Sequence, residues 1–458
     1  MPLEGIKYMH FIGIGGIGMS ALARYFNHLG IKVSGYDRLA TELTKNLEKE
    51  GMTIYHQEDL NLLPAAIKEK AGSEEVMIVY TPAVPSEFTE RHYFESLGIS
   101  VFKRAEVLGM IAKTLKTVAV AGTHGKTTTT SLLAAFMKEA GFNFVGFVGG
   151  INENTGSNLI IQGKPEYLLA EADEYDRSFL HLHPDRAVLT SLDPDHLDIY
   201  GDAENMIETY ELFCRDVKEE LWLSEKISEL MRKTSHKSYG FSESSTARAE
   251  NVESSGKTFT FDFVMGGTII EKLPLNIAGY HNVENCTGAI ALALGMGIGK
   301  DHIRSALIKY QGVKRRFEYH INNENLIYID DYAHHPSEID AVLMSIRKMY
   351  PGKRITGVFQ PHLYSRTRDF GEDFARSLAQ LNELILLDIY PAREKPIPGI
   401  DSHWLLNKVQ INKKEVCQKE NLLTVIESKD PEIILTIGAG DIDQLVNPIK
   451  QYFNPTNL

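Results

Sequence analysis

A short pattern occurs three times in this 458-residue chain: an apolar strand runs into glycines and then into a helical stretch. The three copies begin near residues 8, 117 and 433, and their glycine turns occupy 13–18, 122–125 and 438–440. An apolar strand that passes to a helix through such a turn is typical of a parallel sheet. The repeated pattern therefore predicts an α/β protein with three parallel-sheet units.

The stretches between these units indicate where the domains divide. At about 150 residues per domain, the length is consistent with three domains. One helical stretch at 104–113 precedes the second strand, and another at 301–311 ends at Gly312, before a strand expected at 326–330. Short strands with Ser and Gly turns at 242–275 look like an insertion in the middle domain. We therefore predict domains at 1–112, 113–313 and 314–458.

Composition narrows the range of partners. The chain has 61 acidic and 48 basic residues, and its formal net charge of −13 argues against a broad nucleic-acid surface. No apolar run reaches the ~18 residues of a membrane span, and the first residues do not resemble a signal peptide. Cys214, Cys286 and Cys417 lack metal-site or disulfide-framework spacing. We expect a protein of the reducing cytoplasm that binds small molecules, with no nucleic acid and no membrane partner.

The first glycine turn has the spacing of a nucleotide site. Gly13, Gly15 and Gly18 satisfy G-x-G-x-x-G, and Asp37 closes the following strand. Backbone without side chains lets a diphosphate approach the positive end of the next helix, and the acid can accept ribose hydroxyl protons. Nicotinamide dinucleotide is the usual ligand of this pattern. The alternative is a tight strand-to-helix turn that holds no ligand.

The second glycine turn is similar to a phosphate-binding loop. The full G-x-x-x-x-G-K-[ST] pattern fails because position 120 is Val, but the half that carries the chemistry is present. Backbone N–H groups and Lys126 would hold the β and γ phosphates, and the Thr127 hydroxyl would bind Mg²⁺. A Gly-Lys-Thr triplet also occurs by chance, but its place between a strand and a helix favours ATP. The predicted ATP-binding residues of this turn are Gly122, Thr123, His124, Gly125, Lys126, Thr127 and Thr128.

Two acidic clusters follow apolar strands of the same domain, at 171–176 and 193–198. A carboxylate at a strand end beside a phosphate loop is where a nucleotide-bound metal would be held. Each cluster alone is more often a solvated loop, but together they favour a metal site with Thr127, Glu171 and His196 as ligands. Because His is an unusual ligand for Mg²⁺, Mn²⁺ is also compatible.

An Asn-rich stretch precedes a small-residue helix expected at 286–294. The side-chain amides of Asn282 and Asn285 could pair with the edge of a base, or the polar residues of this stretch could simply cap the helix. The residues alone do not separate these two interpretations.

Two further motifs lie at strand ends in the last third of the chain. Tyr332 and His334 follow the strand at 326–330, and crowded polar residues at the carboxyl end of a strand are typical of a site. The neighbouring His335 is better explained as a loop residue or a helix cap. Arg366 and Arg368 follow another strand and could clamp a carboxylate or phosphate, although one of the two would be a surface charge.

Taken in order, these motifs resemble those of the Mur ligases of bacterial cell-wall synthesis. The resemblance covers nearly the whole chain, and the shortened phosphate loop is itself what this family shows. It implies a Rossmann-like N-terminal domain for a UDP-sugar, a central P-loop ATPase-like α/β domain and a Rossmann-like C-terminal domain for an amino acid. The segments that carry it are 10–20, 122–128, 171–174, 195–198, 281–282, 331–336, 359–368 and 396–402.

The resemblance also assigns roles to the candidate residues. The first glycine turn would hold the diphosphate of a UDP-sugar in place of a dinucleotide, through Gly13, Gly15, Gly16, Gly18, Met19, Ser20 and Asp37. The adenine side of ATP would contact His281, Asn282 and Asn285, and the nucleotide phosphates would contact Arg316. The incoming amino acid and the developing charge would face Tyr332, His334, Arg366 and Arg368.

The branch of the family that this motif order resembles most joins L-alanine to the lactyl carboxylate of UDP-N-acetylmuramate. The resemblance implies that the carboxylate attacks the γ-phosphorus of ATP and that the amine of L-alanine then displaces phosphate. Lys126 and Arg316 would neutralise charge, and His334 would either stabilise the adduct or help to deprotonate the amine. Sites on three domains imply a closure that keeps water from the acyl phosphate.

Other functions remain open from the sequence. The nearest is a murein-tripeptide recycling ligase, because Tyr175 stands where many Mur ligases carry Ser and that enzyme shares the feature. A nicotinamide-dependent oxidoreductase would leave the second glycine turn unexplained, and a nucleotide switch or regulatory ATPase would hydrolyse ATP regardless of a UDP-sugar. The protein could be a monomer or a homodimer.

Overall fold

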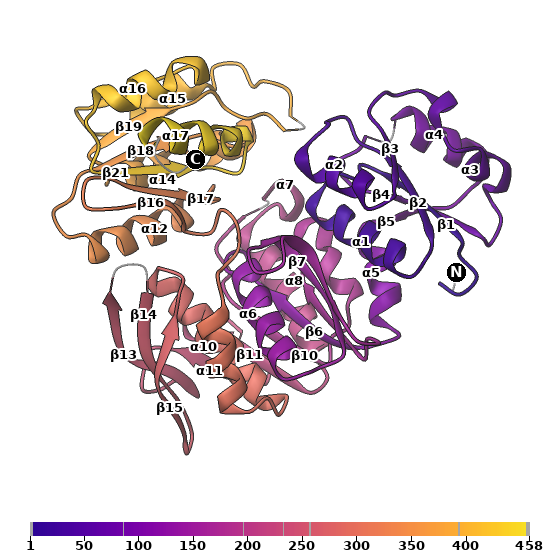
Figure 1. The fold of residues 1–458 in the computed structure, drawn as a ribbon, viewed down its shortest axis with the longest axis horizontal. Coiled ribbons are helices and arrows are strands. Elements are labelled where there is room, and N and C mark those ends of the chain that lie inside the picture. Colours follow the sequence, from indigo (N-terminus) through magenta and orange to yellow (C-terminus); the bar gives the residue numbers. More distant parts are fainter. Residues whose placement is uncertain are drawn as a thin grey trace. The chain divides into compact units, whose positions relative to one another are not determined.

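The computed structural model describes residues 3–85, 87–195, 197–231, 233–255, 258–392 and 394–454. By their internal contacts, the residues of the chain divide into two compact units, which are taken one at a time below. The first unit comprises Met1–Glu250, Asp262–Leu273 and Glu284–Gln311, and the second comprises Asn251–Phe261, Pro274–Val283 and Gly312–Leu458. Figure 1 traces the chain from the indigo N-terminal elements to the yellow C-terminal ones.

The first unit begins with a five-stranded parallel sheet in the order β3-β2-β1-β4-β5. Its strands are β1 (Tyr8–Ile12), β2 (Lys32–Tyr36), β3 (Thr53–Tyr55), β4 (Val76–Tyr80) and β5 (Val101–Lys103). Its helices are α1 (Ile17–His28), α2 (Glu42–Lys49), α3 (Ala65–Lys70), α4 (Thr89–Ser96) and α5 (Arg104–Ala112), with a 3₁₀ turn at Leu60–Leu62. The strand order reverses between β1 and β4, and ligands of such sheets bind at the carboxyl ends of the strands at this point. The first glycine turn follows β1 there.

A ten-stranded sheet follows, in the order β15-β14-β13-β12-β11-β10-β6-β9-β7-β8. Its central strands β6, β9 and β10 run parallel, whereas β8 is antiparallel to β7. The strands are β6 (Lys116–Ala121), β7 (Phe144–Asn152), β8 (Ser157–Gln162), β9 (Tyr167–Glu171), β10 (Arg186–Leu189), β11 (Glu220–Ser224), β12 (Lys237–Gly240), β13 (Ala247–Ser255), β14 (Thr258–Met265) and β15 (Thr268–Leu275). The last three are the short strands predicted within 242–275.

The helices of this region follow or separate its strands along the chain. The loop connects β6 to α6 (Lys126–Glu139), the helix predicted from about 127. The others are α7 (Leu197–Tyr200), α8 (Ala203–Arg215), α9 (Glu225–Ser228), α10 (Tyr280–Gly295) and α11 (Lys300–Lys309), with a 3₁₀ segment at Tyr175–His181.

One apolar core joins the N-terminal sheet to strands β6, β7, β9, β10 and β11 of the ten-stranded sheet, all within the first unit. Helix α1 buries Met19, Leu22, Ala23 and Phe26, which share one face because they recur every three or four residues. The helix packs on β7 and β8, where Tyr25 meets the ring of Phe147 with centroids 5.7 Å apart. The glycine turn that precedes α1 is therefore fixed to the same framework as the phosphate loop.

The second unit contains a six-stranded sheet in the order β16-β17-β21-β18-β19-β20. Strand β16 is antiparallel to β17, and the remaining strands pair in parallel. The strands are β16 (Glu318–Asn322), β17 (Ile327–Asp331), β18 (Ile355–Phe359), β19 (Glu383–Leu386), β20 (Lys414–Val416) and β21 (Ile433–Ile437). Strands β17, β18 and β21 are buried along their whole length, which explains their nearly continuous apolar sequences.

The helices of this sheet begin at or near strand ends that carry polar motifs. They are α12 (Pro336–Met349), α13 (Tyr364–Asp369), α14 (Gly371–Leu378), α15 (Ser402–Lys408), α16 (Leu422–Ser428) and α17 (Val446–Phe453), with 3₁₀ turns at Lys419–Asn421 and Asp441–Leu445. His335 is the N-cap of α12, and its side chain accepts a hydrogen bond from the backbone N–H of Ser337, so the capping prediction is confirmed.

One element prediction was wrong. Helix α10 starts at Tyr280 and not at 286, because Gly279, with φ +108°, turns the chain and accepts the first helical hydrogen bonds from Asn282 and Val283. The third glycine turn leads into the 3₁₀ helix Asp441–Leu445, which continues directly into α17, so the helical stretch predicted after it is present. Across the described part of the chain, every helix is too short or too polar to cross a membrane.

Candidate active site

The phosphate loop contains two glycines whose backbone conformation disfavours any other residue. Gly122 has φ +123° and Gly125 has φ +83°, in the region that strains a residue with a Cβ atom. A Cβ atom at Gly122 would lie 2.2 Å from Oγ1 of Thr190, and one at Gly125 would lie 2.6 Å from Oδ1 of Asn285. The glycines therefore let the loop turn sharply into α6 while it lies against neighbouring segments.

Hydrogen bonds fix the loop to the segment after β10. The backbone N–H of Thr123 donates to the carbonyl of Ser191 at 3.2 Å, and that of His124 donates to Oγ of Ser191 at 2.7 Å. Gly125 caps α6 without a side chain, and the first turn of α6 holds no acidic residue. The N-terminus of a helix attracts anions, so this loop has the electrostatic character that a phosphate site needs, and phosphate binding stays a prediction.

Lys126 lies within this loop as a charged ammonium group. Its Nζ donates to the carbonyls of Gly122 and Thr123 at 2.6 and 3.1 Å, and it lies 2.8 Å from Oε2 of Glu174. Lys126 and Glu174 are 12% and 3% exposed. Burial lowers the pKa of Lys126, but the nearby carboxylates of Glu174 and Glu171 outweigh this effect, and the pKa is raised. Glu174 supplies the counter-charge that a phosphate would otherwise provide, a pairing that the sequence did not predict.

Thr127 and Glu171 bring two oxygen ligands to one point. Oγ1 of Thr127 donates to Oε1 of Glu171 at 3.1 Å, and the other carboxylate oxygen accepts from the N–H of Gly149 at 2.9 Å. Hydroxyl and carboxylate oxygens are the ligands that Mg²⁺ prefers in proteins, so this pair fits a divalent cation beside the phosphate loop. The third predicted ligand, His196, lies outside the described residues.

The three residues predicted for the adenine side all lie in the first turns of α10. Asn285 belongs to the first unit, where its side chain faces Gly125 of the phosphate loop. Asn282 belongs to the second unit, and its Nδ2 donates to the carbonyl of Ala278 at 2.5 Å. The ring of His281 lies against Gly279, where a Cβ atom would be 2.5 Å away. The structure thus brings Asn285 to the loop, and the contact of all three residues with adenine stays a prediction.

The first glycine turn is held closed by Asp37. Oδ2 of Asp37 accepts from the N–H of Gly15 at 2.7 Å, and Oδ1 accepts from the N–H of Leu39 at 3.1 Å. Gly13 has φ +87° and Gly16 is the N-cap of α1, with no side-chain cap. Asp37 therefore shapes the turn in this structure, in addition to the ribose contact predicted for it.

Met19 and Ser20 are almost completely buried in the first turns of α1. The Ser20 hydroxyl donates to the carbonyl of Ile17 at 3.0 Å, and it accepts from Nδ2 of Asn158 at 2.8 Å. Met19 belongs to the apolar core. Both side chains position the helix, and their contact with a UDP-sugar stays a prediction.

Tyr332, His334 and Arg316 lie together in the second unit. The ring centroids of Tyr332 and His334 are 5.3 Å apart, and the Arg316 guanidinium lies 5.0 Å from the centre of the Tyr332 ring. Glu338 links them, because its carboxylate lies 3.2 Å from Nδ1 of His334 and 3.7 Å from Nη1 of Arg316. Glu338 was not predicted from the sequence, although its place three residues after the N-cap His335 marks a capping box.

The two predicted arginines of α13 have different surroundings. Arg366 is buried, and its Nη1 lies 3.3 Å from Nδ1 of His362, whose ring meets His334 at 6.1 Å. Arg368 is 51% exposed and pairs with Asp369 at 2.6 Å. The structure therefore connects Arg366 to the Tyr332–His334 group through His362, which was not among the predicted site residues. It gives Arg368 a surface ion pair.

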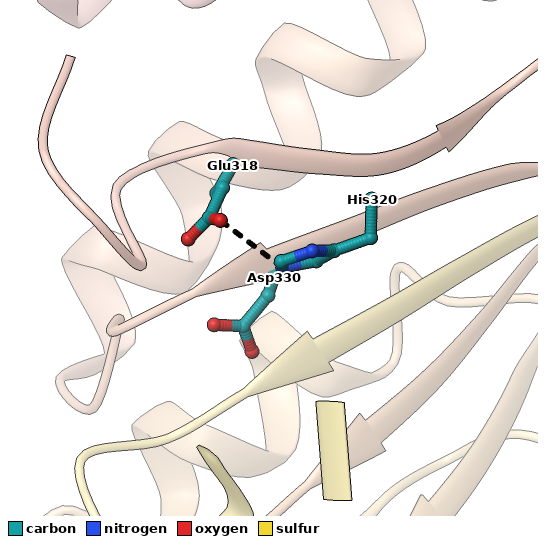
Figure 2. A group of neighbouring side chains, drawn as sticks. All are labelled: Glu318, His320 and Asp330. Carbon is teal, nitrogen blue, oxygen red and sulfur yellow. Dashed lines mark ion pairs between the residues drawn. The ribbon is translucent and has the colours of Figure 1, made fainter. Parts of the chain in front are cut away.

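A second polar cluster lies on the β16–β17 hairpin (Figure 2). Ligand atoms of Glu318, His320 and Asp330 lie within 4.8 Å of one another, and burial lowers the pKa of His320. Nε of Arg315 donates to Oδ2 of Asp330 at 2.9 Å, and the backbone N–H of Arg315 donates to Oε2 of Glu318 at 2.8 Å. Since the guanidinium of Arg315 already pairs with Asp330 and its backbone N–H binds Glu318, the cluster acts as a polar network that fixes the hairpin.

Three family models match the chain in succession. They are the Mur ligase family catalytic domain at residues 8–116, the Mur ligase middle domain at 120–293 and the Mur ligase glutamate ligase domain at 315–440. The chain belongs to the Mur ligase family. Its three sheets are those of the three-domain α/β fold of Mur ligases, with Rossmann-like first and last domains, as predicted.

Relatives of this Mur ligase match along nearly their whole length. UDP-N-acetylmuramate–L-alanine ligases of Christiangramia forsetii and Flavobacterium johnsoniae are each 45% identical, and the matches cover 98% and 99% of both chains. The crystal structure of UDP-N-acetylmuramate-alanine ligase from Thermotoga maritima matches with a TM-score of 0.82 and 25% identity, over 98% of this chain and all of that one. A murein peptide ligase from Psychrobacter arcticus shares the fold, with a TM-score of 0.72 and 20% identity over 99% of each chain.

Proposed function

We propose that this Mur ligase joins L-alanine to UDP-N-acetylmuramate with the consumption of ATP, and that Lys126 and its loop hold the triphosphate. The observation that carries the proposal is the buried Lys126 ammonium at the N-terminus of α6, where no side chain caps the helix. The names of the full-length relatives at 45% identity favour L-alanine over a preformed tripeptide as the second substrate. We place the functional domains at 1–112, 113–313 and 314–458.

The reaction proceeds in two steps. A lactyl carboxylate oxygen attacks the γ-phosphorus of ATP, the bond to the β–γ bridging oxygen breaks, and ADP leaves. The amine of L-alanine then attacks the acyl carbon, the C–O bond to phosphate breaks, and phosphate departs with its electron pair. Lys126 and Arg316 neutralise the phosphates, since positioning and charge stabilisation carry most of the catalysis in phosphoryl transfer.

The residues around Tyr332 receive the amino acid in this proposal. Glu338 beside Nδ1 orients the His334 ring, which stabilises the anionic adduct or accepts a proton from the amine. Arg366, held by His362, pairs with the carboxylate of L-alanine.

A divalent cation completes the ATP site. Thr127 and Glu171 hold it, with His196 as a further ligand, and when bound it supplies positive charge beside the phosphates. We propose Mg²⁺ as the physiological ion, with Mn²⁺ as a substitute. We further propose that the enzyme works in the cytoplasm as a monomer or homodimer on small molecules alone.

Replacement of Lys126 tests the assignment of the ATP site. We expect Lys126→Ala to lower kcat by about a hundredfold or more, because a charge that stabilises the transition state is lost. Binding of UDP-N-acetylmuramate, measured by calorimetry, stays at the wild-type level. Lys138→Ala is the matched control, because Lys138 lies exposed at the far end of the same helix. Wild-type turnover of Lys126→Ala would show that the ATP assignment is wrong.

A panel of acceptors tests the substrate. Phosphate release is measured with ATP, Mg²⁺ and UDP-N-acetylmuramate against L-alanine, glycine, L-serine and the murein tripeptide. We expect the highest kcat/KM with L-alanine. Release with the tripeptide only would assign the enzyme to recycling.

A further inference from the structure

Arg104 lies against the first glycine turn, although no motif pointed to it. It is the first residue of α5, directly after β5 of the N-terminal sheet. A Cβ atom at Gly18, the second residue of α1, would lie 2.9 Å from Nη1 of Arg104 and 3.1 Å from Cζ. The third glycine of the G-x-G-x-x-G pattern therefore leaves room for a guanidinium group in the first turn of α1.

This position is electrostatically unusual for a cation. The N-terminus of α1 already carries the positive end of the helix dipole, Gly16 caps it without a side chain, and its first turn holds no acidic residue. A guanidinium adds a second positive feature at the same place. Such a combination stabilises a bound anion better than either feature alone, and a planar guanidinium matches two phosphate oxygens.

Asp173 holds Arg104 in this structure. Nη2 of Arg104 donates to Oδ2 of Asp173 at 2.8 Å, and the two side chains are 19% and 43% exposed. Asp173 lies in the turn after β9, and Oδ1 of the same carboxylate accepts from the N–H of Tyr175 at 3.1 Å. Ion pairs that are this accessible to water are weak, so a dianionic ligand can compete for Arg104.

The residue after Asp173 makes the equivalent contact on the ATP side, because Glu174 pairs with Lys126. Two neighbouring carboxylates of one turn thus each hold a cation from a phosphate site: Arg104 at the first glycine turn and Lys126 at the phosphate loop. Asp173 therefore holds the cation that lies beside the first glycine turn, where the UDP-sugar is proposed to bind.

We propose that Arg104 binds the diphosphate of the UDP-sugar and that Asp173 is a positioning residue that holds Arg104 until the diphosphate arrives. The inference rests on the proposed function, and it deepens that function by naming a diphosphate ligand outside the glycine turn. On binding, Arg104 exchanges its single hydrogen bond to Asp173 for charge-assisted hydrogen bonds to phosphate oxygens. Asp173 therefore weakens the binding of the UDP-sugar, and it does so only through Arg104.

A double-mutant cycle tests this relation. UDP-N-acetylmuramate is titrated by calorimetry, without ATP, into the full-length wild type, Arg104→Gln, Asp173→Asn and the double variant. We expect Arg104→Gln to weaken binding by about tenfold or more, since a charge-assisted contact to phosphate is lost. We expect Asp173→Asn to tighten binding by about two- to fivefold, the size of a partly exposed ion pair. In the Arg104→Gln background the Asp173 substitution has no effect.

The increase in affinity distinguishes the proposal from a merely structural role, because damage to the fold would weaken binding. Glu75→Gln is the matched control: it removes an acid that pairs with Lys7 and Lys70 just before β4, at the amino ends of the parallel strands, whereas the glycine turn follows the carboxyl end of β1. We expect it to leave affinity unchanged. Circular dichroism melting confirms that each variant is folded.

A comparison of UDP with UDP-N-acetylmuramate shows which part of the ligand Arg104 contacts. If the diphosphate is the partner, Arg104→Gln weakens UDP and UDP-N-acetylmuramate by the same factor. A loss with UDP-N-acetylmuramate alone would place Arg104 at the sugar or its carboxylate and overturn the assignment. Unchanged affinity in Arg104→Gln, or weaker binding in Asp173→Asn, would also overturn it. Absence of UDP-sugar binding in the wild type would instead contradict the proposed function itself.

Discussion

Burial changes the charge state of one carboxyl group at the end of β17. Asp331 is 5% exposed, and its two oxygens accept from the N–H groups of Phe317 and Ala333, both at 2.7 Å. Burial raises the pKa of Asp331 to about 7, although Arg316 and the two N–H groups act in the opposite direction. Near neutral pH this side chain therefore changes between its acid and carboxylate forms beside the Tyr332–His334 group.

This shift predicts a pH dependence of stability. Between about pH 4 and 7 the folded chain keeps a proton on Asp331 that the unfolded chain releases, so the free energy of unfolding falls as pH rises through this range. The full effect is about 4 kcal/mol. We expect Asp331→Asn to remove it, so that urea unfolding midpoints of the variant depend less on pH between 5 and 8. Asp301→Asn, an exposed acid in α11, serves as the control. Parallel pH profiles of wild type and Asp331→Asn would contradict the assignment.

At the scale of elements, α6 offers a comparison between its two ends. Gly125 at its start and Gly141 just beyond its end both have positive φ, +83° and +76°. A Cβ atom at Gly125 would meet Asn285, whereas one at Gly141 would have no heavy atom of the described structure within 4 Å outside its chain neighbours. A residue with a Cβ atom would therefore be strained at either position, but only at Gly125 would it also meet a neighbouring side chain.

Alanine substitutions should separate these effects. We expect Gly125→Ala and Gly141→Ala each to lower the free energy of unfolding by about 1–2 kcal/mol, the cost of a left-handed backbone with a Cβ atom. Only Gly125→Ala should also raise KM for ATP, by about tenfold, because the loop must move away from Asn285. Steady-state kinetics and urea titrations measure both quantities. An equal KM for the two variants would mean that the close approach of Asn285 has no part in ATP binding.

On the scale of the whole molecule, the three cysteines report on the two units. All three thiols are buried; Cys214 and Cys286 belong to the first unit and Cys417 to the second. Burial raises the pKa of each thiol, that of Cys214 to about 12. The reactive thiolate is therefore scarce in the folded protein at neutral pH.

Thiol labelling during unfolding follows from this distribution. We expect the native protein to react with none of its thiols within minutes and the unfolded protein to react with three. With increasing urea, Cys214 and Cys286 should become reactive together, and Cys417 should do so at a different concentration, since compact units of one chain can unfold separately. Mass spectrometry of pulse-labelled peptides identifies each site. Labelling of all three at one midpoint would show that the units unfold as one.

Much of the fold could be predicted because its signals are local. An apolar run, a glycine turn and a helix lie within about 30 residues, which is how the units beginning near 8 and 117 were found. The prediction failed at α10, where His281 and Asn282 look like residues before a helix but lie inside it. Gly279 is the local signal of the true start, since its positive φ places the turn one residue before Tyr280.

The sequence by itself determined the parallel-sheet units, the phosphate loop and the family, because each depends on residues that are neighbours in the chain. Only the tertiary structure decided which charges meet. Lys126 and Glu174 are 48 residues apart, and Arg104 and Asp173 are 69 apart. Charged side chains carry no periodic pattern that reveals a distant partner; strand order and helix packing bring these pairs within hydrogen-bonding distance.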